Sequence, residues 1–249
     1  MLLLFLCLPS HNIIFTTHKM NVNYGNVPLD ESEVLPYQFT QQSYKKEADR
    51  ENIGDFEYDA DLSNVNTAVY HNQKTKKTHV SNRGSVTAKD WFVSDLQVAA
   101  GAEDYGKRFQ DALHTTWKAH DKYGYNVTTS GHSLGGTLSA YQTEKLGNEA
   151  WYDHGTSFNM GSSPLGTDNP ISERRRTCGS KNPPAFCNKM TNIKQSGDYI
   201  SRNAASFGNT KTYHDKPGLL NRFARFVSPA YRVQQNFSQH SLKNFSLPT

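Results

Sequence analysis

A serine flanked by glycines is the residue of this chain whose surroundings most directly indicate chemistry. In the stretch TTSGHSLGG, Gly131, Ser133 and Gly135 form the pattern G-x-S-x-G, and His132 and Gly136 belong to the same turn. Such a pattern predicts a nucleophile elbow, in which the serine lies on a sharp turn between a strand and a helix. Glycines are needed there because the turn strains the serine backbone and brings strand and helix close together. Because the same letters also occur by chance in glycine-rich loops, the prediction depends on the flanking elements.

A nucleophilic serine needs two partners. Its hydroxyl is a poor nucleophile near neutral pH, so a histidine must take its proton and an acid must orient that histidine. In α/β hydrolases the acid and then the histidine follow the serine in the chain. The histidines that qualify by this order are His154, His214 and His240. Spacing alone does not choose between the last two, since TYHDKPG is typical of a surface turn and QHSLKNF lies near the terminus.

One aspartate is favoured as the acid. Asp198 directly follows the predicted strand MTNIKQ at 190–195, and a carboxylate at the end of a strand would point into the site. The other aspartates considered lie in less informative loops: Asp153, Asp168 and Asp215.

Strand-like and helix-like segments alternate around these residues. The β-branched segment 125–130 leads into the elbow, and a helical pattern that ends at Gly147 follows it, which is the order that an elbow requires. An amphipathic helix is predicted over 103–123, ended by Gly124, with one side formed by Phe109, Leu113, Thr116, Trp117 and His120. Further predicted elements are strands at 66–72, 77–84, 155–160 and 190–195 and a helix at 42–54. The alternation predicts an α/β fold, with a central, mostly parallel sheet flanked by helices.

Four short segments occur in an informative order. They are NRGS at 82–85 followed by TAKDW, GHSLGG at the elbow, DYIS beginning at Asp198, and HSLKNF at 240–245. Together they resemble the class 3 lipase family, the fungal-lipase-like α/β hydrolases, over roughly residues 60 to 245. The resemblance implies that Ser133, Asp198 and His240 form the catalytic triad. The segments IGDFEYDADLSN and RGS-x-T-x-x-DW also resemble class 3 lipase-like proteins of large DNA viruses.

The same resemblance implies two further parts of the site. The backbone N–H groups of Ser85 and Leu134 would form the oxyanion hole, in line with the need for one donor after the nucleophile and one from an upstream loop. The alternative for Ser85 is a simple turn residue. The segment VTAKDWFVSDLQVAAG that follows would be a mobile lid whose Trp91 or Phe92 enters lipid, and the alternative is an ordinary core helix.

These residues predict a serine ester hydrolase. The resemblance implies acyl-lipid substrates, as for a triacylglycerol lipase, and a peripheral lipid interface. Two alternatives stay open, a phospholipase A1 acting on anionic membranes and a catalytically silent lipid-binding protein of the same fold. Triad chemistry needs no cofactor. No metal is expected, because His71, His79 and the cysteine pair form no recognised ligand spacing, and GHSLGG lacks the Lys-Ser or Lys-Thr pair of a phosphate loop.

Charge is unevenly distributed along the chain. Residues 1–62 carry 10 Asp or Glu against 4 Lys or Arg, and residues 174–249 carry 13 Lys or Arg against 2 Asp. Either the acidic flank packs on the basic one, or both are ordinary solvated faces. Alternatively, the basic third faces an anionic partner. Lipid headgroups are the expected partner, and no nucleic acid is expected.

The length of 249 residues suits one domain, expected over residues 20–249. Residues 1–19 are expected to be an apolar N-terminal extension or a weak signal segment, because the run from Leu2 to Leu8 is too short to span a bilayer. The sequence leaves the localisation open between a soluble or membrane-peripheral protein and a secreted one.

Two segments of the sequence are candidates for covalent modification. Cys178 and Cys187 are nine positions apart and can close a disulfide loop, while Cys7 makes the cysteine count odd. The sequon at Asn126 falls in a predicted core strand, so it is discounted as a glycosylation site.

Overall fold

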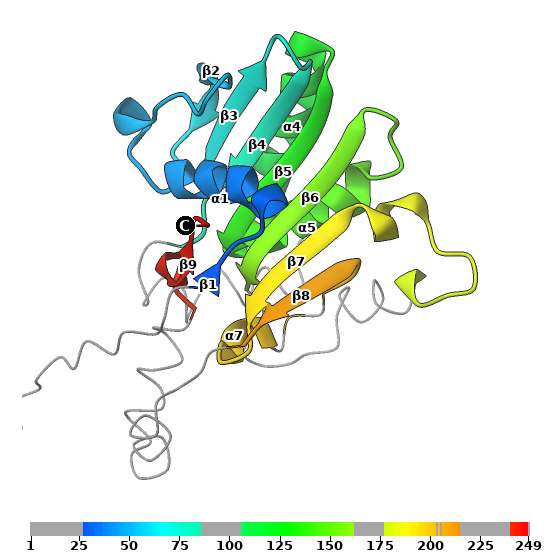
Figure 1. Ribbon diagram of the computed structural model, residues 1–249. Coiled ribbons are helices and arrows are strands. Elements are labelled where there is room, and N and C mark those ends of the chain that lie inside the picture. Colours follow the sequence, from blue (N-terminus) through cyan, green and yellow to red (C-terminus); the bar gives the residue numbers. More distant parts are fainter. Residues whose placement is uncertain are drawn as a thin grey trace, which may run out of the picture.

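A seven-stranded sheet organises the chain (Figure 1). The computed structural model describes residues 27–85, 106–161, 177–202, 204, 206–214 and 240–248, so the expected N-terminal extension at 1–19 lies outside it. The strands lie in sequence order across the sheet. They are β2 (Glu57–Asn64), β3 (Thr67–Asn72), β4 (Lys77–Asn82), β5 (Asn126–Ser133), β6 (Tyr152–Met160), β7 (Met190–Gln195) and β8 (Asn209–Tyr213).

The sheet is mostly parallel. β2, β3 and β4 form an antiparallel meander, whereas β4 through β8 pair in parallel. Parallel neighbours need crossover connections, and helices usually provide them. The expected central, mostly parallel sheet flanked by helices is confirmed. The predicted strands at 66–72, 77–84, 125–130, 155–160 and 190–195 are all present, each within a few residues of its expected bounds.

Helices cover both faces of the sheet. The helix α1 (Glu31–Ser43) crosses one face, and α4 (Lys107–Tyr123) and α5 (Leu134–Leu146) lie on the other (Figure 1). The remaining elements are short. They are β1 (Val27–Pro28), η1 (Glu47–Asp49), η2 (Ala185–Asn188), α7 (Tyr199–Arg202), η3 (Leu242–Asn244) and β9 (Phe245–Ser246).

The first helix is not where the sequence pattern placed it. The helix predicted over 42–54 is wrong, because most of that segment consists of turns and the three-residue η1, and the helix α1 ends at Ser43. Tertiary packing explains the difference, since most helical stability in proteins comes from burying one face. α1 buries Tyr37 and Phe39 against the sheet, whereas no side chain of η1 is buried. Because proline disfavours a helix interior, Pro36 inside α1 makes helix propensity predict no helix there.

The helix α4 confirms the prediction over 107–123, and residues 103–105 lie outside the description. Gly124 ends it in the left-handed conformation, with φ of 63°, and donates its N–H to the His120 carbonyl. The buried face is rotated from the predicted one. Its members are Phe109, Ala112, Thr115, Thr116 and Ala119, while Trp117 is 37% exposed. Ala119 packs on strand residues and Ala112 packs on α5, so this side of α4 faces the core while the bulky indole faces outward.

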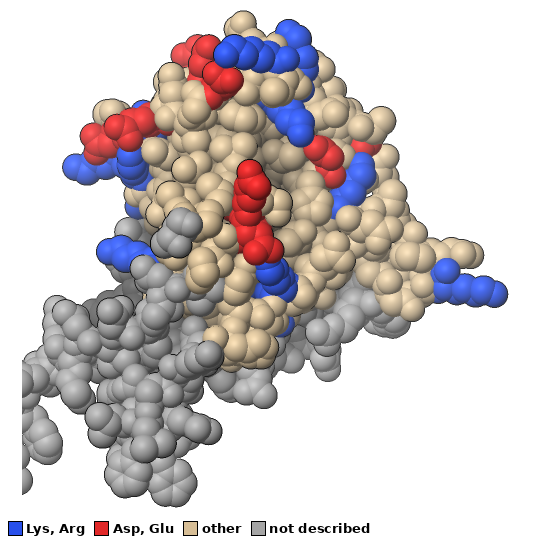
Figure 2. Space-filling view, in the orientation of Figure 1, with Lys and Arg blue, Asp and Glu red and all other residues tan. Residues whose placement is uncertain are grey.

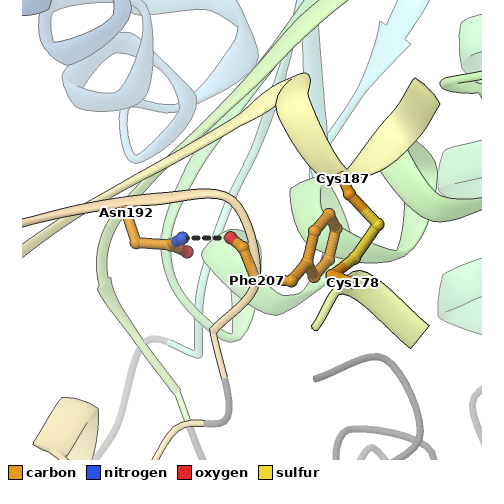
Figure 3. The surroundings of a disulfide bond; sticks show 4 residues. All are labelled: Cys178, Cys187, Asn192 and Phe207. Carbon is orange, nitrogen blue, oxygen red and sulfur yellow. Dashed lines mark hydrogen bonds between the residues drawn. A yellow bond between two sulfur atoms is a disulfide. The ribbon is translucent and has the colours of Figure 1, made fainter. Parts of the chain in front are cut away.

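A disulfide ties the segment before β7 together (Figure 3). Cys178 and Cys187 are bonded, with Cα atoms 5.4 Å apart, and Phe207 lies beside them in the same apolar cluster. Buried Asn192 on β7 donates its side-chain N–H to the Phe207 carbonyl at 2.7 Å. The disulfide therefore closes the loop before β7, and the segment before β8 packs on that loop through Phe207.

Opposite charges meet where the acidic flank reaches the sheet edge. Lys211 on β8 forms ion pairs with Asp30 and with the buried Glu33 at the start of α1. On the face drawn in Figure 2, Lys and Arg side chains lie interspersed with Asp and Glu rather than gathered in a patch of one sign. At this edge of the sheet, the acidic start of α1 therefore pairs with Lys211, the basic residue of β8.

One expectation about modification is corrected. Asn126 is exposed, because it begins β5 at the end of the sheet where the strand enters from solvent, and burial starts at Val127. Burial therefore gives no reason to discount its sequon. Within the described part of the chain, no helix combines the length and the apolar character that crossing a bilayer requires.

Candidate active site

The predicted elbow joins β5 to α5. β5 ends at Ser133 and α5 begins at Leu134, and Ser133 has φ of 57° and ψ of −127°, a strained conformation for a residue with a side chain. Close approach explains the glycines. A Cβ on Gly131 would lie 2.2 Å from the Gly135 carbonyl, and one on Gly135 would lie 2.1 Å from the Asn82 carbonyl oxygen. This strained serine between a parallel strand and a helix is the arrangement of an α/β-hydrolase elbow.

Three predicted residues meet at the end of the sheet. Ser133 Oγ lies 2.8 Å from His240 Nε2, and His240 Nδ1 lies 2.8 Å from Asp198 Oδ2. All three are buried, Asp198 completely. Because a carboxylate only accepts, Nδ1 of a neutral His240 carries the proton, which leaves Nε2 able to accept from the serine hydroxyl. The arrangement can take a proton from Ser133 as its oxygen attacks.

The turn after β7 positions Asp198. Gln195 ends the strand and its N–H donates to the Asn159 side chain on β6, while its carbonyl accepts from the Asp198 N–H at 3.1 Å. The Ile200 N–H then donates to Asp198 Oδ1 at 3.0 Å. One carboxylate oxygen is therefore held by the backbone and the other faces His240.

The loop of His240 is held by the opposite end of the described chain. β9 directly follows η3 and pairs in parallel with β1. Tyr37 on α1 donates its hydroxyl to the Phe245 carbonyl at 2.8 Å and packs edge-on against the Phe245 ring. Asn244 adds a side-chain bond to Gln195 near the acid turn. α1 and β1 thus anchor the segment that delivers the histidine.

The other histidine candidates lie elsewhere. His214 is exposed just after β8, and His154 on β6 contacts Thr191 on β7, with burial lowering its pKa. Asp153 is exposed at the start of β6, and Asp168 and Asp215 lie outside the described residues.

The two predicted oxyanion donors lie on either side of the elbow. Leu134 supplies the first amide of α5, and Ser85 follows Gly84, on which an added Cβ would lie 3.2 Å from Ser133 Cβ. Arg108 on α4 donates to the Arg83 carbonyl and so braces the same segment. Trp91 and Phe92, the candidate lid residues, lie outside the described residues.

Sequence reasoning missed two groups behind the triad. Tyr44 follows α1, and its hydroxyl lies 2.9 Å from Nδ1 of His132. Burial raises the pKa of Tyr44 to about 12 and lowers the pKa of His132 to about 3, with the charge of His240 adding to the latter shift. Both are therefore neutral at ordinary pH. His132 was identified only as part of the elbow, and no local pattern links it to Tyr44 across 88 positions.

Metal ligation has no support among the residues with described positions, where no three His, Cys, Asp or Glu side chains converge. His79 is buried against Thr128 and Ser130 and stacks on Phe39, so it belongs to the core.

Comparisons with known proteins match the chain to a lipase-like family. Residues 29–174 match the family model described as phospholipase-like, Tle-like phospholipase domain. No curated protein gives a significant match. Similar solved structures include the Lip2 lipase from Yarrowia lipolytica, with 13% identity, a TM-score of 0.43 and coverage of 72% of this chain and 77% of that one. A Rhizomucor miehei lipase propeptide complex has 16% identity, a TM-score of 0.43 and coverage of 78% and 72%. A triacylglycerol lipase from Penicillium expansum has 16% identity, a TM-score of 0.43 and coverage of 76% and 81%.

Proposed function

Because the chain belongs to the family of Tle-like phospholipase domains, we propose that it is a serine ester hydrolase that cleaves acyl lipids through Ser133, His240 and Asp198. The expected likeness to a lipase-like family is confirmed by that match, and the likeness to viral proteins stays a prediction. The observation that carries the proposal is the continuous chain from the strained Ser133 through His240 to the buried Asp198, with both contacts at 2.8 Å.

The reaction begins with attack on the ester. Ser133 Oγ adds to the carbonyl carbon while its proton passes to His240 Nε2, and Asp198 stabilises the resulting imidazolium through Nδ1. The carbonyl oxygen becomes an oxyanion that accepts from the Ser85 and Leu134 amides. When the tetrahedral intermediate collapses, the alcohol leaves with the proton from Nε2, and the acyl group stays on Ser133.

A water molecule completes the cycle. It attacks the acyl carbonyl as His240 Nε2 takes one of its protons, and a second oxyanion forms at the same two amides. Collapse returns the proton to Ser133 Oγ and releases the fatty acid. No metal or organic cofactor is required at any step.

The family description favours phospholipids over triacylglycerol as the acyl lipid. The basic third of the chain would add affinity for anionic headgroups, and raising the ionic strength should then weaken binding to phosphatidylglycerol vesicles more than to phosphatidylcholine vesicles. A catalytically silent lipid-binding protein is disfavoured, because binding alone gives no reason to keep a strained serine in contact with histidine and acid.

Ester hydrolysis with two histidine variants tests the proposal. His240→Ala should lower kcat on a short p-nitrophenyl ester by at least about 10³-fold, because it removes the base that contacts Ser133 Oγ. His214→Ala is the matched control, since this exposed histidine also follows the serine in the chain. Loss in His214→Ala with full activity in His240→Ala would refute the assignment. A panel of phospholipid, triacylglycerol and short ester then ranks the substrates.

A further inference from the structure

Behind the triad, a line of hydrogen bonds joins three segments that are distant in sequence. The Gly84 N–H donates to the Tyr44 hydroxyl at 3.1 Å, and that hydroxyl lies 2.9 Å from Nδ1 of His132. On the other side of the ring, Nε2 of His132 lies 2.5 Å from the backbone carbonyl of His240. The line therefore runs from the oxyanion segment, through the elbow, to the residue that takes the proton.

The direction of each bond follows from the groups at its ends. A carbonyl only accepts, so the single ring proton of neutral His132 lies on Nε2 and points to His240. Nδ1 is then an acceptor, and the Tyr44 hydroxyl must donate to it, since its other acceptor contact, the His132 carbonyl, is longer at 3.4 Å. The tyrosine oxygen is left to accept from the Gly84 N–H.

The segments at both ends carry catalytic groups of the proposed mechanism. Gly84 precedes Ser85 and lies against the elbow, where an added Cβ would be 2.6 Å from the His132 carbonyl oxygen. At the far end, the carbonyl that accepts from His132 belongs to His240 itself. A shift of either segment would move an oxyanion donor or the imidazole relative to Ser133.

We propose that Tyr44 and His132 are positioning residues of this site, which fix the Gly84–Ser85 segment and the His240 loop relative to Ser133 through one ordered line of hydrogen bonds. The inference rests on the proposed function. Neither residue exchanges a proton with substrate, since each keeps its proton throughout the cycle. Their contribution is alignment, which acts on the transition state more than on substrate binding.

Tyr44→Phe is the direct test. It removes one oxygen, and with it both the acceptor for Gly84 and the donor for His132. We expect kcat to fall about 10- to 100-fold with KM changed less than about threefold, because misalignment costs transition-state stabilisation. Tyr152→Phe is the matched control. Its hydroxyl is also buried and contacts two hydroxyl groups, Thr129 and Thr143 at 2.7 Å each, on β5 and α5 away from the triad.

The result that overturns the proposal is a kcat for Tyr44→Phe within twofold of the wild type, or a loss no larger than that of Tyr152→Phe. If Tyr44→Phe folds poorly, two variants of His132 test the same proposal. His132→Gln keeps an N–H donor for the His240 carbonyl, whereas His132→Leu does not, so the glutamine variant should retain more activity. Equal loss in both would also count against an alignment role.

An NMR measurement separates this inference from the proposed function. In wild-type protein labelled with ¹⁵N-histidine, His132 should show one exchange-protected proton on Nε2 and no titration near its ordinary pKa of 6.5. A proton on Nδ1, or titration near 6.5, would overturn the bond directions even in an active enzyme. If the protein hydrolyses no ester yet shows the Nε2 proton, the proposed function fails while the hydrogen-bond line stands.

Discussion

Replacing Asp198 by asparagine should disable the site without changing its shape. Asp198 Oδ1 accepts from the Ile200 N–H, and Oδ2 accepts from His240 Nδ1. In Asp198→Asn, the amide oxygen is expected to keep the Ile200 bond, so the NH₂ group faces Nδ1. His240 must then switch its proton to Nε2, which can no longer accept the proton of Ser133.

The magnitude follows from the two orientations of the amide. If the amide oxygen turns toward His240, Nδ1 can again carry the proton and Nε2 can accept from Ser133. The amide NH₂ then faces the Ile200 N–H, and this contact between two donors costs about 1–3 kcal/mol at a buried site. The minor population that can react also lacks the carboxylate that stabilises the imidazolium. Together these losses are expected to lower kcat by about 10⁴-fold, or about 5 kcal/mol of transition-state stabilisation.

The assay is hydrolysis of a short p-nitrophenyl ester at saturating concentration, with urea unfolding to confirm that the variant folds. Asp153→Asn is the matched control, because Asp153 is exposed and lies at the far end of β6. A kcat for Asp198→Asn within about tenfold of the wild type would refute this account of how His240 is oriented.

Three further predictions concern stability. Burial lowers the pKa of His79 to about 3 from 6.5, so the unfolded chain binds a proton in that pH range that the folded chain excludes. The free energy of unfolding should therefore be highest above about pH 6.5 and decrease as the pH is lowered, with His79 costing about 2 kcal/mol at pH 5. Urea midpoints of the wild type and of His79→Gln, measured at both pH values, should show the difference. Replacing Cys178 and Cys187 by serine should lower the free energy of unfolding by about 2.5 kcal/mol, because a short closed loop is released. Gly135→Ala should lower it by at least about 2 kcal/mol and abolish hydrolysis, since its Cβ would meet the Asn82 carbonyl.

Each of these has a contrary result. An equal pH dependence in His79→Gln would show that this imidazole is not the group excluded from protonation. Unchanged urea midpoints after cysteine replacement would contradict the stabilising role of the disulfide. For the elbow, Gly124→Ala is the control, because nothing lies within 4 Å of a Cβ there although φ is +63°. Gly135 has no left-handed φ, so a cost there no larger than at Gly124, where only backbone strain acts, would contradict the crowding argument.

Much of the sheet could be predicted from sequence because its central strands are short, β-branched and bounded by turns. β3 and β4 were predicted on that basis and are buried along nearly their whole length. β2 and β8 were missed. In EYDADLSN, Tyr58, Ala60 and Leu62 alternate with polar residues, but none of the three is fully buried, and NTKTY is polar and at most half-buried. α1 was missed because its helix depends on packing rather than on its own residues.

The site also contains residues that the local sequence predicts and residues that only the fold brings together. The elbow is a local pattern, so Ser133 and its glycines could be identified from neighbouring residues. The choice of His240 over His214 rested on a family resemblance, because the contact with Ser133 spans 107 positions. No sequence pattern indicated Tyr44, because its contact with His132 forms only when α1 lies across the sheet.

Covalent labelling tests the central claim most directly. A fluorophosphonate probe reacts with a serine that is activated as a nucleophile, and peptide mapping identifies the modified residue. The account predicts one modified peptide, which contains Ser133, and no labelling of folded Ser133→Ala. Labelling of a different serine, or undiminished labelling of Ser133→Ala, would contradict it.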